Sequence, residues 1–290
     1  MSEFAKRMLV AAVLIPAVLL ILFMDNTIPF AIGLYATIIF GNRELMRMLI
    51  AGGEDVSKLA SHAGAVLIPI CFYLGHPFIG ESDTSAGIHL ASTFDTWMML
   101  GFVLVGLIFL VFLLKLFSAE PNKGTIRFIA VNLFGAIFFP FFLSFLWLIR
   151  QFQDGSFWIL FIFVTIWLSD GMAYIVGSKI GKHKIVPKVS PKKSLEGFIA
   201  GIIFGVGGAI FTYYFWLEAN TPMHVAKVII ISIDLVIAGI LGDLFESMLK
   251  RDAGVKDSGK LLPGHGGIYD RVDALLMASP VLYMYLSAWG

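Results

Sequence analysis

The most concentrated chemistry in this sequence lies in residues 243–273, a polar stretch in a chain that is 58% hydrophobic. Asp243, Glu246 and Lys250 recur at helical spacing, so they fall on one face of a single helix. A carboxylate at membrane depth costs about 2.5 kcal/mol or more on insertion scales, so it should face a cavity, a partner or a metal. This face predicts either ion pairs with Lys250 and Arg251 at the membrane surface or a cation-binding site.

A second pair of carboxylates opens the next predicted helix. Asp270 and Asp273 are one turn apart and share a face. Together with Asp243 they offer hard oxygen ligands without a His or Cys cluster, which suits Mg²⁺ better than zinc or copper. The sequence therefore predicts Asp243, Asp270 and Asp273 as metal ligands.

Between these carboxylates lies a glycine-rich turn, 263–267, that leads directly into the helix start. Glycines let backbone N–H groups approach an anion, and the helix dipole favours a phosphate there. A plain flexible loop is the alternative. The flanking basic residues favour phosphate binding, with His265, Gly266 and Gly267 as contacts. These basic residues are Lys250, Arg251, Lys256 and Arg271.

A lysine-rich loop, 177–197, forms the second polar segment, and we expect it to meet residues 243–273. Basic loops are common on the cytoplasmic side of membrane proteins and attract anionic lipid, which is the ordinary explanation for most of these lysines. Lys192 and Lys193 are more specific, because hydroxyls flank them and a helix follows, as expected where a polyphosphate is held. The substrate-binding candidates here are Ser169, Asp170, Ser190, Lys192, Lys193, Ser194 and Glu196.

The elements that position these residues are membrane helices. Mean hydropathy is +0.87 and only 14% of residues are charged, which predicts an all-α integral membrane protein. A span needs roughly 20 apolar residues, and the chain offers about nine such runs. We place them at 8–24, 28–40, 62–79, 97–117, 126–149, 157–176, 198–216, 225–250 and 268–289, with 45–50 extending the second. The first run lacks a cleavage site and is interpreted as a retained anchor.

The distribution of positive charge predicts the orientation. With a cytoplasmic N-terminus, all of the 21 Lys and Arg residues except Arg150 and Lys227 lie on the cytoplasmic side. This places the C-terminus on the opposite side and both polar segments at the cytoplasmic face. We expect 1–150 to form a hydrophobic half of about five spans, and 151–290 a catalytic half of about four spans with cytoplasmic loops 177–197 and 251–268.

Charge and cysteine content exclude other classes. The single Cys71 rules out an intramolecular disulfide and a multi-thiolate metal site. The net charge is +1 and the basic residues are confined to loops, so no nucleic-acid partner is expected. The sequence leaves a homodimer open.

The polar segments contain two motifs at fixed spacing. The first is Ser247-x-x-Lys250-Arg251-x-x-x-x-Lys256-Asp257 followed by Pro263-Gly264-His265-Gly266-Gly267-x-x-Asp270-Arg271-x-Asp273; the second is Gly181-Lys182-His183-Lys184 with Ser190-Pro191-Lys192-Lys193. Both resemble motifs of the bacterial phosphatidate cytidylyltransferases, also called CDP-diacylglycerol synthases. The family's usual small residues after the Ser-Asp pair are here Gly171 and Met172, and Ser194 stands where Thr is usual.

The resemblance implies an enzyme of phospholipid biosynthesis in the cytoplasmic membrane. Such enzymes join CTP and phosphatidic acid to give CDP-diacylglycerol and pyrophosphate, using Mg²⁺ and often a second, monovalent cation such as K⁺. Asp243, Asp270 and Asp273 would then hold the metal. Lys250, Arg251, Lys256 and Arg271 would neutralise phosphate charge, and Lys192 and Lys193, with the Gly266 and Gly267 backbone, would steady the pyrophosphate.

Two alternatives stay open at this point. A CTP-dependent transferase acting on another lipid, such as an ether lipid or a polyprenol, would need the same phosphate chemistry. An ion-coupled transporter would use Asp170, Asp234 and Asp243 as an ion path. Transporters show internal repeats and broken helices at the membrane midplane, whereas the polar residues here gather at one end of the predicted spans.

Overall fold

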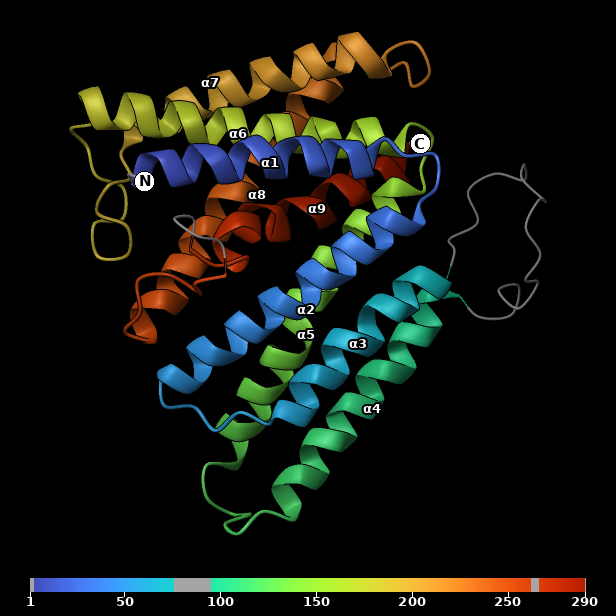
Figure 1. The fold of residues 1–290 in the computed structure, drawn as a ribbon, viewed down its shortest axis with the longest axis vertical. Helices are drawn as coiled ribbons and strands as arrows, with labels where there is room; N and C mark the ends of the chain where they lie inside the picture. Colours follow the sequence, from blue (N-terminus) through green and yellow to red (C-terminus); the bar gives the residue numbers. More distant parts are fainter. Residues whose placement is uncertain (1–2, 76–94, 262–265, 290) are drawn as a thin grey trace. The chain divides into compact units, whose positions relative to one another are not determined.

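The chain is built from helices joined by loops (Figure 1). The computed structural model describes residues 3–75, 95–261 and 266–289. Within these ranges the elements are α1 (Glu3–Leu22), α2 (Ile28–Ala51), α3 (Lys58–Leu74), α4 (Thr96–Leu116), α5 (Thr125–Arg150), α6 (Gly155–Ile180), α7 (Leu195–Thr212), the π-helical segment η1 (Tyr213–Leu217), α8 (Val225–Asp252) and α9 (Tyr269–Trp289). The predicted all-α class is confirmed.

Six helices in the described ranges are long and apolar enough to cross a membrane: α4, α5, α6, α7 with η1, α8 and α9. The protein is therefore an integral membrane protein. Lys58–Leu74 and the Ala12–Leu22 part of α1 are shorter apolar helices. The helix predicted at 28–40, with an extension at 45–50, is continuous to Ala51, and several of residues 41–48 are buried.

The helices form two compact units. The first comprises Met1–Leu148 with Ala253–Asp270, and the second comprises Ile149–Asp252 with Arg271–Gly290. The polar segment 253–270 therefore groups with helices from the beginning of the chain. The predicted division at residue 150 into a multi-span half and a catalytic half stays a prediction.

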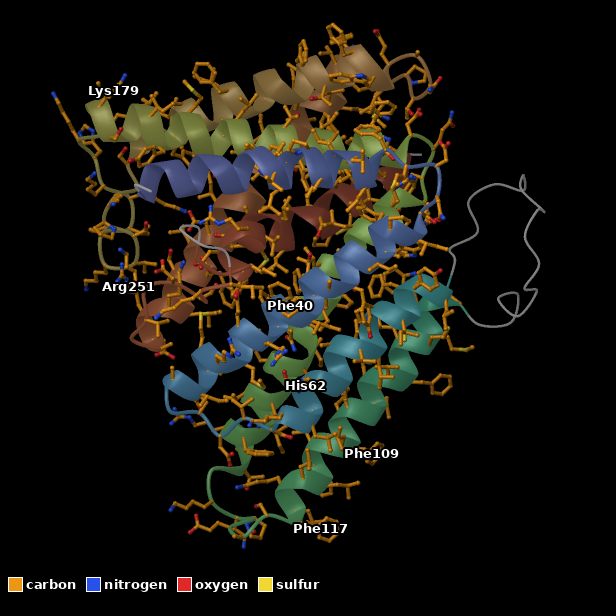
Figure 2. The ribbon with its side chains drawn as sticks, viewed as in Figure 1. Phe40, His62, Phe109, Phe117, Lys179 and Arg251 are labelled. Atoms are coloured by element: carbon orange, nitrogen blue, oxygen red, sulfur yellow. The ribbon has the colours of Figure 1, made fainter. Side chains whose placement is uncertain are left out.

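In the first unit, buried polar groups and small residues join α2, α3 and α5. A Cβ on Gly64 of α3 would overlap the carbonyl oxygen of Ala136, so these backbones approach as closely as only a glycine allows. The Asn42 amide donates to the hydroxyl (2.9 Å) and carbonyl oxygen (3.1 Å) of Ser61. On α4, Phe109 is 62% exposed (Figure 2), as expected of a side chain that faces lipid.

In the second unit, α7 packs closely along α6. Gly197, Gly201 and Gly205 recur every fourth residue, and a Cβ on any of them would press against α6 atoms, which is the small-residue spacing typical of membrane helix contacts. Lys179 near the end of α6 and Arg251 at the end of α8 lie at the same end of this unit (Figure 2). The lysine-rich loop after α6 and the polar end of α8 therefore lie at the same end of this unit.

Candidate functional site

The lysine-rich loop between α6 and α7 is closed on itself by backbone hydrogen bonds. Leu195 N–H donates to His183 O (2.8 Å), and Ile185 N–H donates to Lys193 O (3.3 Å). Glu196 lies 2.7 Å from Nδ1 of His183 and accepts from its backbone N–H. These contacts fix the two sides of the loop next to the start of α7, so Glu196 shapes the loop.

Ser194 and Lys193 occupy the end of this loop. Ser194 is the N-cap of α7, and its hydroxyl accepts a hydrogen bond from Gly197 N–H at 3.3 Å. The neighbouring Lys193 Nζ lies 2.9 Å from Asp243 Oδ2 and also donates to Ile240 O at 3.3 Å. The predicted meeting of the two polar segments is therefore confirmed at this ion pair.

Three carboxylates of the second unit converge beside Lys193. Oxygen atoms of Asp243, Glu246 and Asp273 all lie within 4.8 Å of one another. Asp243 and Asp273 are half-buried, and Glu246 is 1% exposed. Lys250, one turn further along α8, lies 2.6 Å from Glu246 Oε2. The ion pairing offered as an alternative for this helix face is thus found between Glu246 and Lys250, although the pair is largely buried and not at the surface.

A glycine brings α8 and α9 together at this cluster. A Cβ on Gly242 would overlap the carbonyl oxygen of Asp273 and lie 3.2 Å from Cα of Ala274. Only a residue without a side chain allows this approach. Because Gly242 precedes Asp243, the same contact that joins the helices places Asp243 beside Asp273.

The donor set of this cluster fits a hard divalent cation. Mg²⁺ prefers oxygen ligands and is usually bound through one or two carboxylates with water and substrate phosphate completing the octahedron. Asp243 and Asp273 supply carboxylates from two different helices, and Lys193 and Lys250 limit the repulsion between the acidic groups. Asp170 on α6 lies within electrostatic range of both Asp243 and Lys193.

Asp270 belongs to the first unit, where it is bound by the polar segment 253–270. Its Oδ2 accepts hydrogen bonds from Ser258 N–H (3.0 Å), the Ser258 hydroxyl (2.9 Å) and Gly267 N–H (2.7 Å). Gly266 has a φ of 80°, in the left-handed region that glycine adopts without strain. The Gly267 N–H that was predicted to contact a phosphate therefore donates to Asp270 in this structure.

The remaining predicted residues differ in exposure. Ser169 is 2% exposed against α7, and its hydroxyl has no hydrogen-bond partner among the described residues. His265 lies outside the described residues. Ser190 is half-buried in the loop; Asp170, Lys192, Arg251, Lys256 and Arg271 are exposed. Asp234 accepts a hydrogen bond from the Tyr285 hydroxyl, the interhelical role that a lone carboxylate in a span often has.

Sequence analysis missed Glu44 and Ser258. The signal for Glu44 was its position: at helical spacing it shares a face with Gly41, Leu45 and Met48, which are all buried. A carboxylate on such a face must find donors. Ser258 carried no comparable signal, because a single serine in a polar loop is ordinary.

Comparison with known proteins agrees with this geometry. The sequence model of the cytidylyltransferase family matches residues 5–289. A phosphatidate cytidylyltransferase of Bacillus subtilis is 34% identical over 286 residues, covering 98% of each chain. That of Staphylococcus haemolyticus is 44% identical over 134 residues, 46% of this chain and 50% of the relative. That of Mycobacterium bovis is 37% identical over 171 residues, 59% of this chain and 55% of the relative.

Proposed function

Because the chain belongs to the cytidylyltransferase family, we propose that it transfers CMP from CTP to phosphatidate, giving CDP-diacylglycerol and pyrophosphate. The observation that supports this most strongly is the similarity to the Bacillus subtilis relative over 98% of both chains. The acidic cluster beside lysines agrees with it, since a reaction between two phosphate groups needs both a cation site and positive side chains.

The acceptor needs no general base. A phosphate monoester has a second pKa of about 6, so the phosphatidate headgroup is largely ionised near neutral pH and is already a nucleophile. The work of the protein is then to hold two anionic substrates in line and to offset their repulsion. Lys193 is well placed for this role, because its ammonium group is fixed by Asp243 and by the Ile240 carbonyl.

For the metal we propose Mg²⁺ held by Asp243, Asp270 and Asp273, with a monovalent cation such as K⁺ as a second ion. When bound, Mg²⁺ neutralises developing charge on the phosphate oxygens. The proposal is supported by the convergence of Asp243 and Asp273 and by the helical spacing that puts Asp270 one turn from Asp273. Glu246 lies in the same cluster, where its pairing with Lys250 helps to shape the site.

Around the metal, the basic residues would bind phosphate oxygens. Three of them have exposed side chains that could reach a phosphate: Arg251, Lys256 and Arg271. Lys250 would interact with both Glu246 and the substrate phosphate. Lys192 and Lys193 would steady the departing pyrophosphate. Ser169, Asp170, Ser190, Ser194 and Glu196, together with His265 and the Gly266–Gly267 backbone, remain the substrate-contact candidates.

We also propose the finer membrane arrangement. It has about nine spans, a cytoplasmic N-terminus, an opposite C-terminus and a site facing the cytoplasm from the inner membrane. The asymmetry of Lys and Arg supports it, as does the common end at which Lys179 and Arg251 lie (Figure 2). The acyl chains of phosphatidate would stay in the bilayer. A homodimer stays a prediction.

A comparison of lipid acceptors tests this function. Detergent-solubilised protein is incubated with labelled CTP and Mg²⁺ together with phosphatidate, a polyprenyl phosphate or an ether-linked analogue of phosphatidate. We expect labelled CMP to be transferred to phosphatidate at least about tenfold faster than to the other two lipids. Their phosphate groups are alike, but the ether analogue lacks the ester carbonyls and the polyprenyl phosphate also lacks the glycerol, and one lost contact worth roughly 1.4 kcal/mol is a tenfold change. Faster labelling of either other lipid would replace phosphatidate as the substrate.

A further inference from the structure

Glu44 is the most deeply buried carboxylate of the first unit for which the structure gives donors. Its side chain is 3% exposed on α2, where an ionised carboxylate is costly unless hydrogen bonds stabilise it. Its Oε2 accepts from the Ser258 hydroxyl at 3.0 Å and from the Tyr269 backbone N–H at 2.9 Å. These donors lie more than two hundred positions away in the sequence. A buried carboxylate on α2 therefore holds a polar segment that is distant in the sequence.

One of these donors lies at the start of a helix. Tyr269 is the first residue of α9, and the preceding Ile268 has no side-chain oxygen to accept its N–H. Initial N–H groups of a helix lack partners within the helix, and a negative charge there is favoured by the helix dipole. Glu44 supplies both the acceptor and the charge. It therefore acts as a cap contributed by another helix.

The second donor links Glu44 to Asp270. The Ser258 oxygen lies 3.0 Å from Glu44 Oε2 and 2.9 Å from Asp270 Oδ2. A hydroxyl has one proton, so it donates to one of these carboxylates at a time. Asp270 is also held by the backbone N–H groups of Ser258 and Gly267. Only the Ser258 hydroxyl oxygen separates the two carboxylates, so a substitution of Glu44 would alter the hydrogen bonding of Asp270.

The backbone around Glu44 fits its carboxylate closely. A Cβ on Gly259 would overlap Glu44 Oε1, and a Cβ on Gly267 would overlap both Glu44 Oε2 and the Ser258 hydroxyl. The two glycines let the polar segment close around the carboxylate from both sides. Such a fit leaves Asp270 little freedom as long as Glu44 is present.

We propose that Glu44 is a positioning residue that orients Asp270 and the first turn of α9 for metal binding, an inference that rests on the proposed function. Its action is indirect, through Ser258 and the Tyr269 amide. Residues that hydrogen-bond a metal-ligating carboxylate typically contribute about 10–100-fold to metal affinity or activity. This is the size of effect expected here.

A graded pair of variants tests the role. Glu44→Met removes both acceptor and charge at similar length, whereas Glu44→Gln keeps an oxygen and loses the charge. Two quantities are measured in full-length protein: the Mg²⁺ concentration that gives half-maximal CDP-diacylglycerol synthesis, and the hydrogen–deuterium exchange of the Tyr269 amide without Mg²⁺. The matched control is Glu54→Gln, which removes a carboxylate of the same unit that pairs with Arg127.

We expect Glu44→Met to raise the half-maximal Mg²⁺ concentration roughly 10–100-fold and to speed Tyr269 exchange, with Glu44→Gln between it and wild type. Glu54→Gln should match wild type in both. Unchanged Mg²⁺ dependence in Glu44→Met would overturn the proposal, even if exchange rises, because Glu44 would then only stabilise the fold. If Glu44→Met does not fold, Ser258→Ala removes the same link from the loop side and must show the Mg²⁺ shift. An inactive wild type would refute the proposed function instead, and Tyr269 exchange would still decide whether Glu44 holds α9.

Discussion

Gly242→Ala should separate the metal carboxylates without changing any of them. The added methyl group would overlap the Asp273 carbonyl oxygen and lie 3.1 Å from its carbonyl carbon, whereas ordinary Cβ contacts begin at 3.4 Å. Both obstacles are backbone atoms, so no side chain can move aside and α8 must shift from α9. The shift required is on the order of 1 Å, and a misplacement of about 1 Å can lower a rate roughly 100-fold.

The assay is kcat for CDP-diacylglycerol formation, with Tm as a second measurement. Overpacking costs about 1–3 kcal/mol, which the better helix propensity of alanine offsets by up to about 1 kcal/mol. Tm should therefore fall only modestly while kcat falls about 100-fold. Gly207→Ala on α7 is the matched control, because a Cβ there meets nothing within 4 Å. If Gly242→Ala kept the kcat of Gly207→Ala, the helix contact would not set the carboxylate geometry.

The other predictions concern single charges. Asp243→Asn should lower kcat about 1,000-fold or more, because a metal ligand supports several kcal/mol of transition-state stabilisation, while the gel-filtration profile stays that of wild type; a tenfold loss would exclude Asp243 as a ligand. Lys193→Met should lower kcat/KM for CTP roughly tenfold or more, since a hydrogen bond to a charged group contributes about 1.5–3 kcal/mol, and an unchanged value would remove Lys193 from phosphate binding. Arg127 donates to Glu54 and holds the pKa of that carboxyl below its usual 4.5, so the pair stabilises the fold above that pH, and the contribution disappears as pH falls through the lowered pKa. In thermal melts, Glu54→Gln should therefore lose less stability than wild type when the pH falls below 4.5. The difference should be under about 1 kcal/mol because the Arg127 side chain is 70% exposed. Parallel pH profiles would contradict this.

The helical framework followed from sequence because it depends on local properties. Apolar runs of about 20 residues predict spans wherever they occur, and the described helices begin and end near the predicted positions. The clear difference is in α2, where the polar break predicted after residue 40 is itself helical, so that the helix runs without interruption to Ala51. Its polar residues 41–44 resembled a helix end, yet Asn42 and Glu44 are buried by hydrogen-bonding partners that local patterns do not reveal.

The acidic half of the site was also partly predictable. Helical spacing placed Asp243 and Glu246 on one face, and the structure confirms their convergence with Asp273. Spacing could not show that Lys193 would pair with Asp243, but the meeting of the two polar segments was expected. The assignment of each residue to substrate or metal stays a prediction.

Local sequence patterns did not predict which compact unit each segment would join. Segment 253–270 belongs to the first compact unit although its neighbours in sequence belong to the second. The contacts that place it there, from Glu44 to Ser258 and Tyr269, join positions far apart in the chain. Periodicity and composition report the local properties of a segment. Long-range pairs depend on which distant segments it contacts, and local patterns do not reveal that.

The most direct test of the central claim is CDP-diacylglycerol synthesis by the purified chain. Wild-type protein in detergent receives phosphatidate and labelled CTP, first with EDTA and then with excess Mg²⁺. We predict that CDP-diacylglycerol and pyrophosphate appear in equal amounts only after Mg²⁺ is added. Failure of folded protein to form CDP-diacylglycerol with Mg²⁺ present would contradict the account.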